Sequence, residues 1–332
     1  MSNVAVLGAG AWGTALAKVL ADKQNPTFLW SHTAAVANTI NEKRVNERYL
    51  PSAQLPPSLR ATSDLEEALR HADLVVVVVP SHALRGVVAD ARRYIPTNAL
   101  ICSASKGIEN DSLMLMSEVL VDELGKEAEH RLTYLSGPSF AKEVAAGQPT
   151  AVTVAGTSAK ETAKVQHAFA SERLRVYSAD DVVGVEIGGA LKNVIAIAAG
   201  ALDGLGFGHN ARAGVITRGL AEIARVAMAK GGSPLTLAGL SGMGDLILTC
   251  TGDLSRNRTV GFELGRGRTL DDILAKLGHV AEGVKTAKSA YDLGRKLGVE
   301  MPITTEVYKV LYEDKPAFQA VVDVMNRALT KE

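Results

Sequence analysis

Lys192 and Asn193 lie in the middle of an apolar, small-residue stretch that runs from Glu186 to Gly200. In a helix, the residues three and four positions from Lys192 share its face, and none of them is polar: Gly188, Gly189, Ile195 and Ala196. An ammonium group on such a face is costly to bury unless a charged or hydrogen-bonding group meets it. Glu186 is the only acid in the stretch, so we expect a bound ligand to be the partner. The alternative is a lysine that reaches solvent or pairs with a distant acid.

A glycine-rich turn follows the first predicted strand, Val4–Leu7, and contains Gly8, Gly10 and Gly13. In a dinucleotide-binding turn, the first glycine permits the tight turn and the second lets the backbone approach a pyrophosphate. The third allows the next helix to pack on the strand. A second predicted strand follows at 27–30, which is the context that this motif needs. The pattern therefore favours a dinucleotide site over a purely structural turn.

Ser31, His32 and Thr33 follow the second strand, where an acidic residue would bind the ribose hydroxyls of NAD and disfavour a 2′-phosphate. No carboxylate stands there to repel NADPH. His32, Arg44 or Arg48 can meet the extra phosphate, or each can be a solvated surface residue. We therefore expect NADPH or NADH as cofactor, with NADPH used at least as well as NADH.

Further ligand contacts are expected where other predicted strands end. The run Asp73–Val79 is uniformly apolar after its first residue, which is typical of a central parallel strand covered on both faces. The strand at 99–102 leads to Lys106, and the strand at 132–135 runs into the turn 136–141. Because ligands collect at the carboxyl ends of strands in open α/β sheets, a ligand contact is favoured for Lys106 over a surface loop position.

After Ser178 the alternation of strands and helices stops. Two strands, at about 150–155 and 173–177, precede this point, and residues 41–60 with their three prolines interrupt the regular pattern. Beyond the helix of Lys192, helices are predicted at 212–229, 234–239, 259–265, 270–276, 281–296 and 303–313. The chain therefore predicts an N-terminal Rossmann domain (α/β, doubly wound, mostly parallel sheet) over residues 1–180. An all-α domain over residues 181–332 follows, and the cleft between the two is the expected site.

Two polar clusters, 242–245 and 255–258, interrupt the apolar runs of the second domain. Ser255, Arg256 and Asn257 offer a hydroxyl, a guanidinium and an amide at consecutive positions, which suits the oxygens of a phosphate. The alternative is a solvated arginine-rich loop.

The composition is that of a globular protein, with 47% hydrophobic and 22% charged residues. The 36 basic residues balance 36 acidic ones, so no global field attracts nucleic acid or anionic membrane. Cys102 and Cys250 stand far apart without metal-type spacing and are interpreted as buried thiols in a reducing compartment. Met1 leads straight into a strand, which favours a cytoplasmic protein.

Motifs along nearly the whole chain carry a family resemblance: GAGAWGTALA, VVVVVPS, SASKGIE, LSGPSFAKEV, EIGGALKNVIAIAAG, NARAGVITRG, GMGDLILTCTGDLSRNR, AEGVKTAKS and MPITTEVY. In this order they closely resemble the bacterial-type NAD(P)-dependent glycerol-3-phosphate dehydrogenase family. The resemblance implies an oxidoreductase that interconverts dihydroxyacetone phosphate and sn-glycerol 3-phosphate with NADPH or NADH. Its product would supply phospholipid synthesis.

The resemblance also assigns residues, with Lys192 as the catalytic proton donor and acceptor. The implied substrate contacts are Lys106, Gly137, Ser139, Lys192, Asp245, Ser255, Arg256 and Asn257. The implied cofactor contacts, which include the glycine-rich turn, are Gly8, Gly10, Ala11, Trp12, Gly13, His32, Lys106, Ala141, Arg256, Val280 and Glu282. No metal is expected. The chain departs from the family at His32, where arginine is frequent, and at His209, where aspartate or a similar residue is frequent.

Two rival functions stay open at this point. A β-hydroxyacid dehydrogenase would use the same lysine on a carboxylate substrate, and a non-catalytic sensor would bind NAD(P)H as a signal. The cluster Ser255–Asn257 favours a small phosphorylated substrate. No nucleic-acid partner and no membrane span are expected, and the Gly/Ala-rich helices are compatible with a homodimer. Replacing Lys192 by Met is expected to abolish turnover and, by removing a buried ammonium, to raise stability.

Overall fold

The computed structural model describes residues 2–277 and 281–328. The chain divides into two compact units. The N-terminal unit contains the residues through Lys106 together with Met114–Val185. The C-terminal unit contains Gly107–Leu113 together with the residues from Glu186 onward.

The short segment Gly107–Leu113 belongs to the C-terminal unit although it lies early in the sequence. Ile108 is 2% exposed, and its carbonyl accepts a hydrogen bond of 3.3 Å from the Ser289 hydroxyl. The sequence analysis did not anticipate this excursion. The domain limits at 1–180 and 181–332 stay a prediction.

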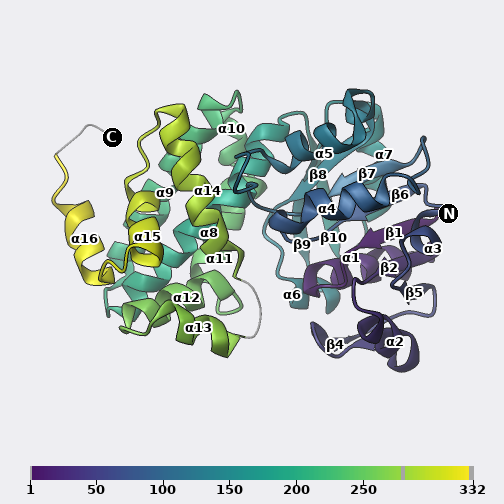
Figure 1. The fold of residues 1–332 in the computed structure, drawn as a ribbon, viewed down its shortest axis with the longest axis horizontal. Helices are drawn as coiled ribbons and strands as arrows, with labels where there is room; N and C mark the ends of the chain where they lie inside the picture. The colour runs from purple at the N-terminus through teal and green to yellow at the C-terminus, as the bar shows by residue number, and fades with distance from the viewer. Residues whose placement is uncertain (1, 278–280, 329–332) are drawn as a thin grey trace. The chain divides into compact units, whose positions relative to one another are not determined.

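An eight-stranded sheet forms the centre of the N-terminal unit (Figure 1), with the strand order β10-β9-β8-β7-β6-β1-β2-β5. Every neighbouring pair is parallel except β8 and β9. Because β1 lies between β6 and β2, the direction in which strands are added reverses there, as in a doubly wound sheet. The predicted Rossmann architecture is confirmed. The strands are β1 (Val4–Leu7), β2 (Thr27–Trp30), β5 (Leu59–Thr62), β6 (Leu74–Val77), β7 (Leu100–Ser103), β8 (Leu132–Ser136), β9 (Thr150–Ala155) and β10 (Leu174–Ala179).

The apolar strands face helices on both sides of the sheet. Side chains alternate between the two faces along a strand, so Val4 and Val6 enter one hydrophobic core while Ala5 and Leu7 enter another. The first core includes α1 (Ala11–Asp22), α2 (Ala34–Lys43) and α7 (Ala159–Phe169). The second includes α3 (Leu65–Leu69), α4 (Ser81–Ala91) and α5 (Met116–Leu124). Burial on both faces explains why β1 and β6 are uniformly apolar.

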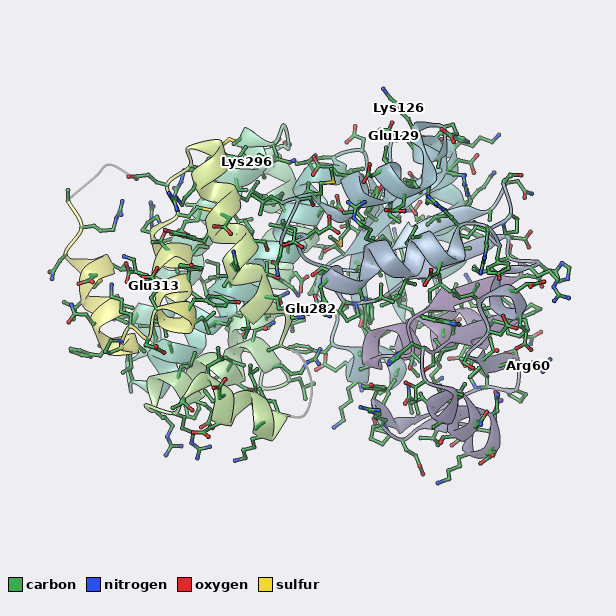
Figure 2. The ribbon with its side chains drawn as sticks, in the orientation of Figure 1. Arg60, Lys126, Glu129, Glu282, Lys296 and Glu313 are labelled. Atoms are coloured by element: carbon green, nitrogen blue, oxygen red, sulfur yellow. The ribbon has the colours of Figure 1, made fainter. Side chains whose placement is uncertain are left out.

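The segment predicted to interrupt the pattern contains three strands. The two-stranded sheet of β3 (Val45–Asn46) and β4 (Leu50–Gln54) is separate from the main sheet, but residues 59–60 begin β5, so the prediction is wrong for them. Leu59 is buried in the first core, whereas Arg60 is exposed and points outward (Figure 2), with its guanidinium 5.7 Å from the ring centre of Phe28. A buried residue followed by an exposed one is typical of a strand at the edge of a sheet. The nearby prolines obscured this pattern in the sequence.

The C-terminal unit is built from helices, as predicted (Figure 1). The sequence analysis did not predict α11 and α16. The helices are α8 (Val182–Gly204), α9 (His209–Ala229), α10 (Pro234–Leu237), α11 (Asp245–Thr251), α12 (Arg256–Gly265), α13 (Leu270–Leu277), α14 (Glu282–Leu297), α15 (Pro302–Tyr312) and α16 (Ala317–Met325), with a π-helical turn η2 at Leu240–Gly244. In the N-terminal unit, η1 (Lys126–Arg131) and α6 (Ala141–Ala145) complete the set.

Helix α8 is the central element of the C-terminal unit. It is long and apolar enough to cross a membrane, the one such helix among the described residues, but 78% of its most apolar window is buried inside the protein. A methyl group on Gly200 would collide with the Arg258 carbonyl of α12, and one on Gly261 would collide with the Ile197 carbonyl. The two helices therefore pack backbone against backbone, which sets where α12 begins relative to Lys192.

Candidate active site

The glycine-rich turn has the geometry expected of a dinucleotide site. Gly8 adopts φ 120° and a side chain there would strike the Val78 carbonyl. A side chain on Gly13 would strike the Gly8 carbonyl, whereas nothing lies within 4 Å of the Cβ position of Gly10. Gly10 is the N-cap of α1 and supplies no side-chain cap, so the first amides of the helix remain directed at an incoming anion. The geometry at Gly8 and Gly13 requires glycine and that at Gly10 leaves open space, and contact with a pyrophosphate stays a prediction.

Other predicted cofactor contacts lie around this turn. Trp12 is in the first turn of α1, and its buried indole N–H has no hydrogen-bond partner among the described residues. His32 is exposed directly after β2. The Arg44 guanidinium donates a hydrogen bond to the Pro56 carbonyl. Arg48 is exposed. Contact of His32 or Arg48 with a 2′-phosphate stays a prediction.

Lys106, Gly137 and Ser139 come together at the carboxyl edge of the sheet. The Lys106 ammonium donates to the Gly137 carbonyl at 3.2 Å, and the Ser139 hydroxyl donates to the same oxygen at 3.0 Å. Gly137 has φ 136°, and a Cβ there would lie 3.0 Å from Cα of Val152, so only glycine fits. Ala141 begins the short helix α6 immediately afterwards.

Two hydroxyls at this edge were not predicted. Ser103 at the end of β7 and Ser136 at the end of β8 are 1% and 5% exposed, and neither side chain has a hydrogen-bond partner among the described residues. Buried polar groups are normally satisfied, so both are further candidates for contact with bound molecules. Their position at strand ends was the available sequence signal.

Lys192 forms a buried ion pair with Asp245. The Lys192 side chain is 9% exposed and the Asp245 side chain 1%, and the ammonium also donates to the Thr249 hydroxyl at 3.0 Å. A distant acid on α11 thus meets the charge, which is the alternative that the sequence left open, and contact with a ligand stays a prediction. Burying two ions is costly, and mutual attraction with further hydrogen bonds is what offsets that cost.

Thr249 was missed by the sequence analysis. Its hydroxyl donates to the Asp245 carbonyl at 2.6 Å, one helical turn away. Thr249 and Asp245 stand four residues apart and so share a face of α11. Predicting a helix over 245–251 would have revealed the pair, but the sequence analysis predicted only a polar cluster at 242–245.

Ser255, Arg256 and Asn257 form the start of α12. Ser255 is the N-cap, and its hydroxyl oxygen accepts from the Arg258 amide at 3.2 Å. Arg256 is exposed, whereas Ser255 and Asn257 are 4% and 9% exposed. Arg258 is held by Asp203 of α8, with its Nη2 2.8 Å from the carboxylate. The cluster is therefore the start of a helix with one exposed guanidinium, not a solvated loop.

The last two predicted cofactor contacts are Val280 and Glu282. Val280 falls outside the described residues. Glu282 is the first residue of α14, and the next amide, of Gly283, donates to the Asn257 side chain at 3.0 Å. Glu282 is thereby connected to the start of α12.

The two thiols are buried, as predicted. Burial raises the pKa of Cys102 and of Cys250 to about 12, so both remain protonated at neutral pH. Cys250 is on α11, next to Thr249, but an un-ionised thiol is a poor nucleophile.

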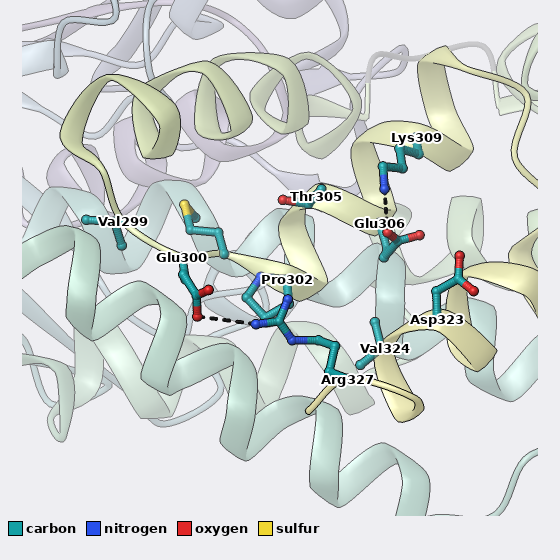
Figure 3. A pocket seen from close by; sticks show the side chains of 10 residues that line it. Val299, Glu300, Pro302, Thr305, Glu306, Lys309, Asp323, Val324 and Arg327 are labelled. Carbon is teal, nitrogen blue, oxygen red and sulfur yellow. Dashed lines mark hydrogen bonds and ion pairs between the residues drawn. The ribbon is translucent and has the colours of Figure 1, made fainter. Parts of the chain in front are cut away.

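A polar hollow of about 290 Å³ lies elsewhere in the C-terminal unit, between α15 and α16 (Figure 3). Figure 3 shows Arg327 directed toward Glu300 and Lys309 toward Glu306, in ion pairs of 3.2 and 2.8 Å. None of the predicted site residues lines it. These four charged side chains are thus engaged with one another.

Comparison with known proteins covers both units. Residues 3–162 match the family model for the N-terminus of NAD-dependent glycerol-3-phosphate dehydrogenase, and residues 181–322 match the model for its C-terminus. A glycerol-3-phosphate dehydrogenase (NAD(P)+) of Myxococcus xanthus is 56% identical over 97% of this chain and 96% of its own, and that of Geobacter sulfurreducens is 53% identical over 99% and 98%. The crystal structure of glycerol-3-phosphate dehydrogenase from Coxiella burnetii superposes with a TM-score of 0.94 at 40% identity, covering 98% of this chain and 99% of that one.

Proposed function

The chain belongs to the NAD-dependent glycerol-3-phosphate dehydrogenase family, and we propose that Lys192 exchanges the proton in its reaction. The enzyme is an oxidoreductase that interconverts dihydroxyacetone phosphate and sn-glycerol 3-phosphate with NAD(P)H, supplying glycerol 3-phosphate for phospholipid synthesis. The observation that carries the proposal is the buried pair of Lys192 with Asp245, because an ion pair this dry is costly to keep.

The cofactor supplies the hydride chemistry when it is bound. The open space beside Gly10 and the uncapped start of α1 fit its pyrophosphate. We propose that Gly8, Gly13 and Ala11 shape this cradle. The remaining proposed contacts to the cofactor are Trp12, His32, Lys106, Ala141, Arg256, Val280 and Glu282.

Lys192 acts where charge develops on the substrate. In ketone reduction, the carbonyl oxygen becomes alkoxide-like, and a nearby ammonium stabilises this charge and delivers the proton. Asp245 orients the ammonium, and Thr249 fixes it from a second direction. In the oxidation direction, the same nitrogen accepts the hydroxyl proton.

The phosphate end of the substrate is assigned to the start of α12. Helix amides at this end have no partner within the helix, and they favour an anion. Ser255 supplies a hydroxyl, Asn257 an amide and Arg256 an exposed guanidinium. Lys106, Gly137 and Ser139 are the proposed contacts to the rest of the substrate.

A turnover assay tests the assignment of Lys192. Oxidation of NADPH followed at its absorbance with dihydroxyacetone phosphate should show turnover in the wild type. Lys192→Ala should bind NADPH normally but turn over at least about a hundredfold more slowly, the low end for general acid catalysis. Near-native kcat in a folded Lys192→Ala protein would overturn the assignment.

The oligomeric state and the cellular location of the enzyme are also proposals. Zero net charge and the burial of α8 support an enzyme of the cytoplasm without nucleic-acid or membrane partners. The Gly/Ala-rich helices are compatible with a homodimer. Light scattering on the purified protein tests the dimer, and a mass of a single chain would refute it.

A further inference from the structure

Asn193, the neighbour of Lys192, takes part in a buried network of amides. The Asn257 amide nitrogen donates to Oδ1 of Asn193 at 2.9 Å, and Oδ1 of Asn257 accepts from the Gly283 amide at 3.0 Å. Asn193 and Asn257 are 7% and 9% exposed. The network therefore joins α8, α12 and α14, the three helices that carry Lys192, the phosphate cluster and Glu282.

One backbone N–H determines how both asparagines point. The Gly283 amide can only donate, so the atom of Asn257 that faces it must be the carbonyl oxygen. The Asn257 nitrogen then faces Asn193, which must present its own oxygen. Of the two N–H groups on that nitrogen, one is used by Asn193 and the other remains for a phosphate oxygen.

Close packing keeps this arrangement in place. A Cβ on Gly283 would lie 2.7 Å from the backbone carbonyl oxygen of Asn193 and 2.8 Å from the side-chain Oδ1 of Asn257. A larger residue at position 283 would therefore displace the Asn257 side chain. The N-cap of α14, Ala281, offers no side-chain cap. Asn257 supplies that missing acceptor from another helix, which also anchors Glu282.

We propose that Asn193 is a positioning residue for the phosphate of the substrate, acting through Asn257. The inference rests on the proposed phosphate site at the start of α12. Without the Asn193 oxygen, the Asn257 nitrogen loses the acceptor that holds it, and a buried amide left unpaired turns to find another partner. The remaining N–H then no longer points at the phosphate.

The test compares two ketones in the intact enzyme. Asn193→Ala should lower kcat/KM for dihydroxyacetone phosphate at least about tenfold, the effect of losing one hydrogen bond to a charged group, chiefly through KM. Its kcat/KM for unphosphorylated dihydroxyacetone should change less than about twofold. Inorganic phosphate should inhibit the variant more weakly than the wild type. An equal loss for both ketones would overturn the proposal, since it would mean a general distortion.

A double-mutant cycle separates positioning from packing. If Asn193 acts through Asn257, the variant Asn193→Ala/Asn257→Ala should be no worse with dihydroxyacetone phosphate than Asn257→Ala alone, and fully additive losses would refute the route. Thr286→Val is the matched control, because this buried α14 hydroxyl has no partner among the described residues, and it should leave both ketones unaffected.

Gly283→Ala tests the network from its other end if Asn193→Ala does not fold. Its methyl group presses on Oδ1 of Asn257, so it should impair use of dihydroxyacetone phosphate selectively, and an equal loss for both ketones would again refute the proposal. Wild-type enzyme without activity on dihydroxyacetone phosphate would instead contradict the proposed function itself, before any variant is compared.

Discussion

Replacing Lys192 by Met tests the buried ion pair and the catalytic assignment together. Sequence alone suggested that the loss of a buried ammonium would stabilise the protein. The structure reverses this expectation, because Asp245 is 0% exposed and its carboxylate would remain in place without its cation. Removing one partner of a buried pair typically costs about 3–5 kcal/mol. At about 2–4 °C per kcal/mol, Tm should fall by roughly 6–20 °C.

The double variant Lys192→Met/Asp245→Asn should recover most of that loss. Both charges are then absent, and well-packed neutral residues in place of a buried pair are often no less stable. The coupling between the two substitutions should therefore be large. Lys192→Met and the double variant should both turn over dihydroxyacetone phosphate at least about a hundredfold more slowly than the wild type.

Thermal unfolding and steady-state kinetics of the two single variants, the double variant and the wild type provide the measurement. Conditions should be matched in pH and salt, and NADPH should be absent from the melts because a bound ligand raises Tm. Two results would refute the reasoning: a Lys192→Met protein as stable as the wild type, or a double variant less stable than either single one. The first would mean that Asp245 does not depend on Lys192, and the second that other contacts determine the stability.

Three further outcomes are expected. Arg256→Ala should weaken dihydroxyacetone phosphate binding by about 1.5–3 kcal/mol with little effect on dihydroxyacetone. The control Arg266→Ala, at the exposed far end of α12, should change the binding of neither ketone. An equal loss for both ketones in Arg256→Ala would make Arg256 structural. NADPH should be used at least as well as NADH, and His32→Asp should lower kcat/KM for NADPH about tenfold or more, since like charges brought together cost several kcal/mol; a wild type strongly selective for NADH would contradict this. The pKa of the Glu222 carboxyl is raised on folding, because the effect of burial outweighs the hydrogen bonds from the Ile303 and Thr304 amides, which lower it. The stability that this carboxyl contributes is therefore fully present below its unfolded pKa of about 4.3. It is lost as pH rises through the folded pKa. Tm measured against pH should show this component in the wild type but not in Glu222→Gln, and parallel curves would disprove it.

Local chemistry made much of the fold and part of the site predictable from sequence. Gly8, Gly10 and Gly13 are required because they have no side chain, and all three lie within six consecutive positions. The short motif is therefore informative by itself. The uniformly apolar β1 and β6 report burial on both faces, which only a covered parallel sheet provides. The cost of burying Lys192 is likewise visible from its helical neighbours.

Contacts between distant residues were decided only by the tertiary structure. Lys192 and Asp245 are 53 positions apart, and no periodicity records which of many acids a buried lysine will meet. The strand β5 was hidden because its evidence is a pairing with β2, a partner remote in sequence. Asn257 looked like a simple phosphate donor until the packing of three helices showed its oxygen engaged by Gly283 and its nitrogen by Asn193. A side chain's type states which bonds it can make, but the packing of the helices around it determines which of those bonds remain for a substrate.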